Sequence, residues 1–301
     1  MAANLSKHAS LSLAEESRAK SRAARLSILT AAFLIALKTA TGWLTGSISV
    51  WASLLDSTMD IFASAINYVA VRTAARPADE DHAYGHGKAE SLAGLFQASI
   101  ITLSGLFLII EAIRRLIIPH SIAATSFGIV AMLIATLVSA LLVTRLRRVA
   151  RATESPALQA DALHYLTDIW TNLGALLALI IVVRTGWLIA DPLISLAISL
   201  YIIWSAVRVG RDSVDVLMDR RLPLEIDDKI AAIVERYRDE GVRGFHDLRT
   251  RRPESVKFID LHLEIDRHKR LDEAHEITVK VLRAIEEEIP RSHVQIHTDP
   301  V

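Results

Sequence analysis

The stretch WASLLDSTMDIFASAINYVAV, residues 51–71, places two carboxylates inside an otherwise apolar run. Asp56 and Asp60 are four residues apart, which puts both side chains on one face of a helix. The run is long enough to cross a bilayer core, which needs about 20 residues. A carboxylate at that depth costs at least ~2.5 kcal/mol on insertion scales. The pair therefore requires a metal ion, a proton or a basic side chain to neutralise it.

A second stretch, ADALHYLTDIWTNLGALLALIIVV at residues 160–183, repeats the pattern. His164 and Asp168 are again four residues apart, near the start of another apolar segment. If the two helices face each other, their side chains supply three carboxylates and one imidazole, a set that suits tetrahedral Zn²⁺ and tolerates other divalent first-row ions. The alternative is that these groups pair with Lys38 or only line a polar bundle interior, but one lysine cannot neutralise three carboxylates.

The composition is typical of a membrane protein with a soluble part attached. The chain has 301 residues, is 51% hydrophobic and has a mean hydropathy of +0.33. Its net charge of +0 predicts no nucleic-acid partner. The absence of cysteine excludes disulfides, thiolate metal sites and cysteine nucleophiles. The first 26 residues are polar and basic, and no cleavable signal peptide is apparent.

Six apolar segments follow a polar tail at residues 1–26, in which a helix is expected near residues 13–26. The cores of these segments are residues 26–44, 49–71, 92–110, 121–144, 158–183 and 192–207. We therefore expect an α-helical membrane protein with six transmembrane helices over residues 27–211.

The charges between the segments predict the orientation in the membrane. One side carries most of the basic residues, namely Arg18, Lys20, Arg22, Arg25, Arg72, Arg76, Lys88, Arg145, Arg147, Arg148, Arg151, Arg208 and Arg211. The other side has only Arg114, Arg115 and Arg184. The positive-inside rule places both termini in the cytoplasm, in agreement with an even number of crossings. Glu111 and Asp191 are expected at the membrane interface and not buried.

From about residue 212 the composition becomes charged and mixed. Helices are predicted at residues 225–237 and 272–288, and strands at residues 242–251, 256–265 and 293–298. The order αββαβ predicts a C-terminal cytoplasmic α+β domain over residues 212–301, with two helices on one face of a small sheet. A domain of this size is small, and dimerisation would help to stabilise it.

In combination, the two helical pairs, the loop RPADEDHAYGHGKAESLAGL at residues 76–95, the six segments and the αββαβ tail resemble the cation diffusion facilitator family. The most similar branch is that of bacterial zinc and ferrous-iron efflux transporters. The resemblance runs from about residue 20 to the end. It implies a homodimer in the bacterial inner membrane that exports a divalent metal ion in exchange for protons by alternating access. The histidine at position 164 is similar to the zinc/cadmium-type pattern.

The ligand chemistry agrees with such an exchange. Crowded carboxylates hold protons more tightly, and an imidazole exchanges its proton near neutral pH. Binding of a divalent metal needs deprotonated ligands and so releases protons. Metal and proton therefore compete for one site, which is the minimum requirement for an antiporter.

A second candidate metal site lies in the loop after the second segment. Asp79, His82 and His86 have a spacing that can wrap one ion, and Glu80 and Asp81 are within reach as alternative ligands. The alternative is a solvated polar loop. The resemblance favours the metal site, because family members have a metal-binding loop with these residues.

The tail has six histidines, which spacing alone does not distinguish from ordinary surface residues. The contexts FHDLRTR, DLHLEI, EAHEI and HTDP match the family, in which they form a two-ion site near the dimer interface. The resemblance thus implies five tail ligands: His246, His262, His275, His297 and Asp299. His268 and His293 have no matching context. Such a site would couple cytoplasmic metal to dimer packing.

Two other functional classes are weighed against transport. A hydrolytic membrane enzyme needs an open metal position for water, and four protein ligands leave none. A membrane-anchored metal sensor without transport would need the tail site and not the membrane site. No prosthetic group is expected. The choice among zinc, cadmium, iron, cobalt and nickel stays open, because affinity order does not decide the physiological ion.

Overall fold

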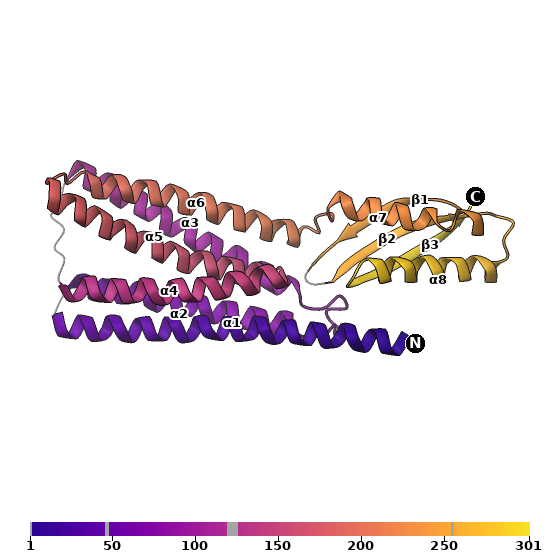
Figure 1. The fold of residues 1–301 in the computed structure, drawn as a ribbon, viewed down its shortest axis with the longest axis horizontal. Helices are drawn as coiled ribbons and strands as arrows, with labels where there is room; N and C mark the ends of the chain where they lie inside the picture. Colours follow the sequence, from indigo (N-terminus) through magenta and orange to yellow (C-terminus); the bar gives the residue numbers. More distant parts are fainter. Residues whose placement is uncertain (1, 46–47, 119–125, 254–255) are drawn as a thin grey trace. The chain divides into compact units, whose positions relative to one another are not determined.

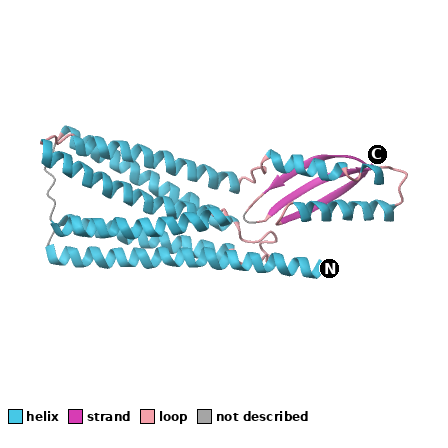
Figure 2. Cartoon of the chain, viewed as in Figure 1, coloured by secondary structure: helices cyan, strands magenta, loops and turns pink. Residues whose placement is uncertain are grey.

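The computed structural model describes the backbone of residues 2–45, 48–118, 126–253 and 256–301. The side chains of residues 2–13, 42, 44–56 and 119–128 also lie outside the described residues. The chain divides into two compact units, one of Ser12–Val214 and one that includes Asp215–Val301. Figure 2 shows that the first is helical and that the second combines helices with strands.

Over the described residues, the first unit is built from six long helices (Figure 1). They are α1 (Ala2–Thr45), α2 (Ile48–Ala74), α3 (Lys88–Ile117), α4 (Ser126–Thr153), α5 (Pro156–Thr185) and α6 (Ala190–Leu217). Five of them, all except α2, contain a described segment long and apolar enough to cross a membrane. The predicted helical membrane domain is confirmed, whereas the crossing by α2, part of which lies outside the described residues, stays a prediction.

Helix α1 is longer than the sequence suggested. The helix expected near residues 13–26 belongs to a single helix that begins at Ala2 and continues through a candidate membrane span at Ala14–Thr41. Residues 2–41 contain neither glycine nor proline, so nothing in them interrupts a helix. The change in polarity near residue 26 therefore does not mark the end of a structural element.

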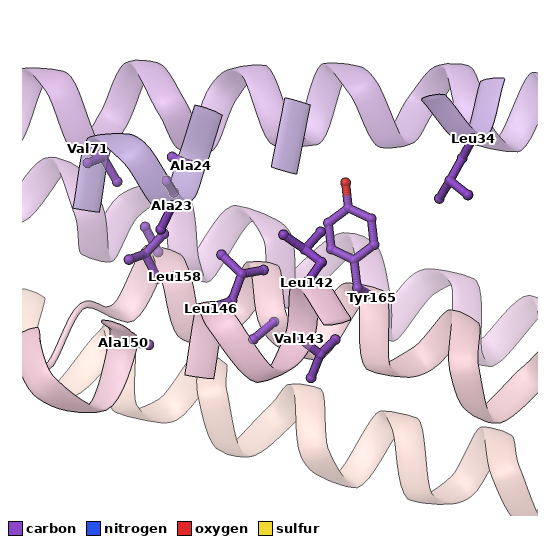
Figure 3. Packing of buried hydrophobic residues seen from close by; sticks show 13 residues of the cluster. Ala23, Ala24, Leu34, Val71, Leu142, Val143, Leu146, Ala150, Leu158 and Tyr165 are labelled. Atoms are coloured by element: carbon purple, nitrogen blue, oxygen red, sulfur yellow. The ribbon is translucent and has the colours of Figure 1, made fainter. Parts of the chain in front are cut away.

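The centre of the first unit is a cluster that joins the first five helices, α1 to α5 (Figure 3). Ala24, Val71, Leu146, Leu158 and Tyr165 are each at most 1% exposed within it. The alanine allows α1 to approach its neighbours closely, as small residues do in membrane helices. This packing sets the positions of α2 and α5, the two helices that carry the predicted membrane ligands.

Glycines allow α6 to approach α3 and α5. A Cβ atom on Gly105 of α3 would lie 2.6 Å from Ile203 Cγ1, and one on Gly174 of α5 would lie 2.2 Å from Ile198 Cδ1. Gly94 of α3 faces Ser213 in the same way. No larger residue fits at these positions without a shift of the neighbouring side chain.

The second unit has the predicted αββαβ order. It contains α7 (Leu224–Glu235), a short 3₁₀ turn (Arg238–Glu240), β1 (Val242–Arg251), β2 (Lys257–Ile265), α8 (Leu271–Glu288) and β3 (Ser292–Pro300). The strand order is β1-β2-β3, with β1 antiparallel and β3 parallel to β2.

The alternation of side chains along β2 decides which face of the sheet is buried. The apolar residues of β2 are 0–1% exposed, namely Ile259, Leu261, Leu263 and Ile265. They form one cluster with residues of both helices, among them Ile230 and Ile233 of α7 and Val281 and Ile285 of α8. Both helices therefore cover the same face, which confirms the predicted arrangement. The intervening residues of β2, among them His262 and Glu264, point to the other face.

The glycine contact between α3 and α6 can be tested with Gly94→Ala. The new methyl would lie 2.8 Å from Ser213 Oγ and 3.2 Å from the backbone oxygen of Pro156. Overpacking costs about 1–3 kcal/mol, against about 1 kcal/mol gained by alanine in a helix. We expect a lower melting temperature for the detergent-solubilised protein, measured by tryptophan fluorescence.

The matched control is Gly210→Ala, whose methyl would meet the Ala98 Cβ at an ordinary 3.4 Å. This variant should melt at or above the wild-type temperature. Equal melting of the two variants would contradict the proposed close approach at Gly94.

Candidate metal centres

The first candidate site lies between α2 and α5. Asp60, His164 and Asp168 each offer a ligand atom, and these atoms all lie within 4.8 Å of one another. Asp60 Oδ1 is 3.0 Å from His164 Nε2, and the two side chains are only 14% and 13% exposed. The structure thus brings together three of the four predicted membrane ligands. The fourth, Asp56, is one turn before Asp60 on α2, but its side chain lies outside the described residues.

The contact between Asp60 and His164 shows what this site can do chemically. A protonated imidazole would form an ion pair with the carboxylate, whereas a divalent cation bound by the same two atoms would exclude that proton. The predicted alternative partner of the carboxylates, Lys38, donates a hydrogen bond to Ser57 Oγ at 2.5 Å.

Sequence reasoning missed a group of polar residues that surrounds this site. Ser27 of α1, Ser64 of α2, and Asp161 and Tyr165 of α5 are each 0% exposed. Asp161 had a readable signal, because it lies three residues before His164 and so shares its helical face. The two serines and the tyrosine had no such sequence signal, because these residues are common in membrane helices that have no functional site.

A buried ion pair closes one end of the helical bundle. Lys20 Nζ lies 2.9 Å from Glu90 Oε1, and the two side chains are 4% and 1% exposed. Ser155, which caps the start of α5, also donates a hydrogen bond to Glu90. Lys20 was expected among the basic residues that flank the first segment, and its burial requires this partner because an isolated buried charge is costly.

A cavity of about 200 Å³ lies between α3, α5 and α6. Thr171, one turn beyond Asp168 on α5, contributes to its lining, as do Glu111, Arg115 and Asp191. The Arg115 guanidinium lies 3.0 Å from Glu111 and 3.1 Å from Asp191. Asp191 was expected at the membrane interface and not buried, but it is only 9% exposed. That expectation was wrong because Arg115 reaches Asp191 from α3.

The second candidate site is the loop before α3. Asp79, His82 and His86 also have ligand atoms within 4.8 Å of one another, and the carboxylate lies 3.3 Å from each imidazole. The backbone N–H of His82 donates to Asp79 Oδ1 at 2.7 Å and is the main cause that lowers the pKa of this carboxyl group. Gly85, with φ of +82°, allows the tight turn between the histidines. The loop therefore presents an ionised carboxylate and two imidazoles together.

The third candidate site lies on the face of the sheet opposite α7 and α8. His246 on β1 is the register partner of His262 on β2, which in turn is the partner of His297 on β3. Asp299 Oδ2 lies 3.2 Å from His246 and 2.9 Å from His262, and Asp299 Oδ1 lies 3.2 Å from His297. The hydrogen bond with His262 is the main cause that lowers the pKa of Asp299, and the three imidazoles add to it.

Two residues of the second unit lie differently from the predicted ligand set of this tail site. His275 lies exposed on α8, which covers the opposite face of the sheet, so its membership of the site stays a prediction. Glu264 was not predicted, but its Oε1 lies 3.1 Å from His246 Nδ1. The signal was present in DLHLEI, because Glu264 follows His262 by two residues and shares its face of the strand.

Comparison with known proteins agrees with this arrangement of sites. Residues 24–218 match the cation efflux transmembrane domain, and residues 222–301 match the cytoplasmic domain of cation efflux proteins. The cation-efflux pumps FieF of Klebsiella pneumoniae and Citrobacter koseri are each 44% identical over 283 residues, which is 94% of this chain and 93% of each relative. The FieF pump of Escherichia coli is 42% identical over the same length.

One solved structure resembles part of the tail. The metal-bound C-terminal domain of the CzcD transporter from Thermotoga maritima is 32% identical and covers 26% of this chain and 88% of that domain. Its TM-score is 0.24, too low to be informative about this chain. The two domain matches and the curated relatives together cover nearly the whole sequence. The chain therefore belongs to the cation efflux family of membrane transporters.

Proposed function

We propose that this transporter is a divalent metal cation/proton antiporter that exports Zn²⁺ from the cytoplasm by alternating access, with Cd²⁺ and Fe²⁺ as further candidate ions. The observation that carries the proposal is the convergence of Asp60, His164 and Asp168 between two helices of the membrane domain. The similarity to cation-efflux pumps supports the outward direction.

The donor set supports a borderline divalent cation. Two carboxylates and one imidazole, completed by Asp56 on the same face of α2, would give four ligands without sulfur. Zn²⁺ accepts nitrogen and oxygen ligands in a tetrahedral arrangement at about 2.0–2.2 Å. Softer ions such as Cu⁺ prefer thiolate and thioether ligands, which this site does not offer.

Proton coupling would follow from competition for the same atoms. In the metal-free site the imidazole of His164 and the carboxylate of Asp60 are close enough to share a proton. A divalent ion needs both groups deprotonated, so its binding expels that proton and its release allows a proton to return. The cavity beyond Asp168, lined by Thr171, Glu111 and Asp191, is a candidate route to the side of the membrane away from the loop site.

We further propose a homodimer in a bacterial inner membrane with both termini in the cytoplasm. The distribution of basic residues supports this orientation. The tail would bind cytoplasmic metal through His246, His262, His297 and Asp299, with His275 as the remaining predicted ligand. No prosthetic group is needed, since the ion is the substrate.

A metal sensor without transport is the second candidate function. It is favoured by a single observation, the three histidines gathered around Asp299 on the sheet. A sensor would keep its function when the membrane site is removed, which is the feature that separates the two candidates.

The antiporter is tested with Asp60→Asn, which keeps the side-chain shape and removes a ligand charge. Metal uptake into proteoliposomes is measured together with an interior pH dye, for Zn²⁺, Cd²⁺, Fe²⁺ and Mn²⁺ in parallel. We expect wild-type Zn²⁺ uptake with opposite proton movement. The rate of Zn²⁺ uptake by the variant should fall at least tenfold. The loss of an outer-shell partner already lowers metal affinity or activity by about 10–100-fold, and Asp60 is a proposed direct ligand.

The matched control is Asp239→Asn, which removes an exposed carboxylate of the second unit and should transport like wild type. Metal uptake without proton movement would refute proton antiport, whereas the proposal of metal transport would still stand. Absence of uptake for every ion, with intact protein and tail binding, would favour the sensor.

The tail site is tested by isothermal titration with Zn²⁺ in the Asp60→Asn background. Asp299→Asn should weaken the tail affinity at least tenfold, because this carboxylate contacts all three histidines. His268→Gln is the matched control and should leave the affinity unchanged. Equal affinities for the two variants would remove Asp299 from the proposed site.

The same titration should depend on pH, because Zn²⁺ binding needs deprotonated ligands. The Zn²⁺ affinity should therefore fall as the pH is lowered from about 7.5 to about 5.5. The pKa of Asp299 is lowered in the folded state, so its stabilising charge is lost only as the pH falls through that lowered value, below the ordinary carboxyl range. Circular dichroism should therefore show a folded domain at pH 5.5, and unfolding at that pH would contradict this assignment.

A further inference from the structure

Two residues of α5 on either side of His164 are fixed to the same residue of α1. We propose that Asp161 and Tyr165 are positioning residues that hold His164 and Asp168 against Asp60 and thereby set the ion selectivity of the membrane site. We call the group Ser27, Ser64, Asp161 and Tyr165 the serine clamp. The inference rests on the proposed role of the membrane site in ion binding.

Ser27 uses two different atoms to hold two successive turns of α5. Its hydroxyl donates to Asp161 Oδ2 at 2.5 Å, and its backbone oxygen accepts a hydrogen bond from the Tyr165 hydroxyl at 3.0 Å. Figure 3 shows the Tyr165 ring within the core, with its hydroxyl directed away from α5. Because Asp161 and Tyr165 are four residues apart, Ser27 fixes both the height and the rotation of α5 at His164.

The clamp also joins the two helices that carry the metal ligands. The Tyr165 hydroxyl lies 3.2 Å from Ser64 Oγ on α2. Ser64 is one turn after Asp60, and Tyr165 directly follows His164. The contact between Ser64 and Tyr165 therefore lies one turn from the contact between Asp60 and His164, and the two together fix the register of α2 against α5.

The clamp also constrains the imidazole itself. The rings of His164 and Tyr165 are 5.4 Å apart and inclined by 69°, an edge-to-face arrangement. A tyrosine held at its hydroxyl cannot rotate away, so it limits the rotation of the neighbouring histidine. The clamp thereby acts on the orientation of a ligand as well as on the position of its helix.

Burial makes the clamp rigid. All four of its residues are 0% exposed, so water does not take the place of a lost partner without rearrangement. Asn67 of α2 is also 0% exposed and donates to Gln97 Oε1 of α3 at 2.8 Å. The hydrogen bonds of the clamp itself join α1, α2 and α5.

Rigid ligands favour one coordination geometry over another. A binding site discriminates between ions only if its ligands are held within about 0.5 Å of the required positions. Zn²⁺ accepts a tetrahedral site with short bonds, whereas Mn²⁺ prefers six oxygen ligands. A loosened α5 would let the ligands follow the ion, which weakens Zn²⁺ binding more than Mn²⁺ binding.

The test is Tyr165→Phe, which removes the hydroxyl and keeps the ring. Zn²⁺ uptake by the full-length protein in proteoliposomes gives KM, and competition by Mn²⁺ gives its inhibition constant. We expect KM for Zn²⁺ to rise about tenfold, at the lower end of outer-shell effects on metal sites. The inhibition constant of Mn²⁺ should change much less, so the preference for Zn²⁺ over Mn²⁺ becomes smaller. Ser64→Ala, which removes one of the clamp contacts, should shift the preference in the same direction by less.

The matched control is Tyr201→Phe on α6, which is 44% exposed and should leave both constants unchanged. Thermal unfolding of each variant separates positioning from folding. Unchanged constants in Tyr165→Phe would overturn the inference. A parallel loss for both ions would overturn it as well, because a purely structural role predicts no change in preference.

The outcome also distinguishes this inference from the proposed function. If Asp60→Asn transports Zn²⁺ as well as wild type does, the membrane site is not the transport site and the clamp has no ion to position. If Asp60→Asn is inactive and Tyr165→Phe matches wild type, the proposed function stands and the clamp alone is refuted.

Discussion

The cost of placing charge inside a membrane bundle is the constraint on which this structure depends. Three pairs of ionisable groups join helices of the first unit: Asp60 contacts His164, Lys20 contacts Glu90, and Asp191 contacts Arg115. Such pairs are weak evidence for stability, because desolvation offsets much of their attraction. They do specify which helices are neighbours, since any other arrangement would leave a charge unpaired in an apolar surrounding. The pair of Asp60 and His164 differs from the other two pairs, because both a carboxylate and an imidazole can lose or gain a proton.

The elements of the second unit were well predicted because the hydrophobic periodicities of its helices and strands are regular. Along β2, apolar residues alternate with polar ones, and this alternation identified both the strand and its buried face. The membrane and loop sites were predicted from His and Asp residues a few positions apart, whereas the tail site was predicted from the resemblance to a known family. Glu264 was missed although it shares the face of His262, because the predicted tail ligands came from the family resemblance, which did not include it.

The remaining features could not be predicted from the sequence, because they depend on contacts between residues far apart in the chain. The burial of Lys20 needs a partner on α3, and the burial of Asp191 needs Arg115 to reach across from α3. Neither pairing has a local signature, and both residues look like ordinary flanking charges. The serine clamp joins α1, α2 and α5 through hydroxyls that local propensity treats as neutral. Long-range polar contacts of this kind follow from the packing of the bundle, which the period of a single helix does not determine.

The buried pair of Lys20 and Glu90 has a consequence for biosynthesis. Glu90 is made 70 residues after Lys20, and Ser155, its second partner, 65 residues after that. A lysine without a partner is costly in an apolar surrounding, so Lys20 is expected to stay at the lipid headgroups until α3 has been made. This end of the bundle can close only after the start of α5 has left the ribosome. The full set of contacts at Glu90 can therefore form only after more than half of the chain has been translated.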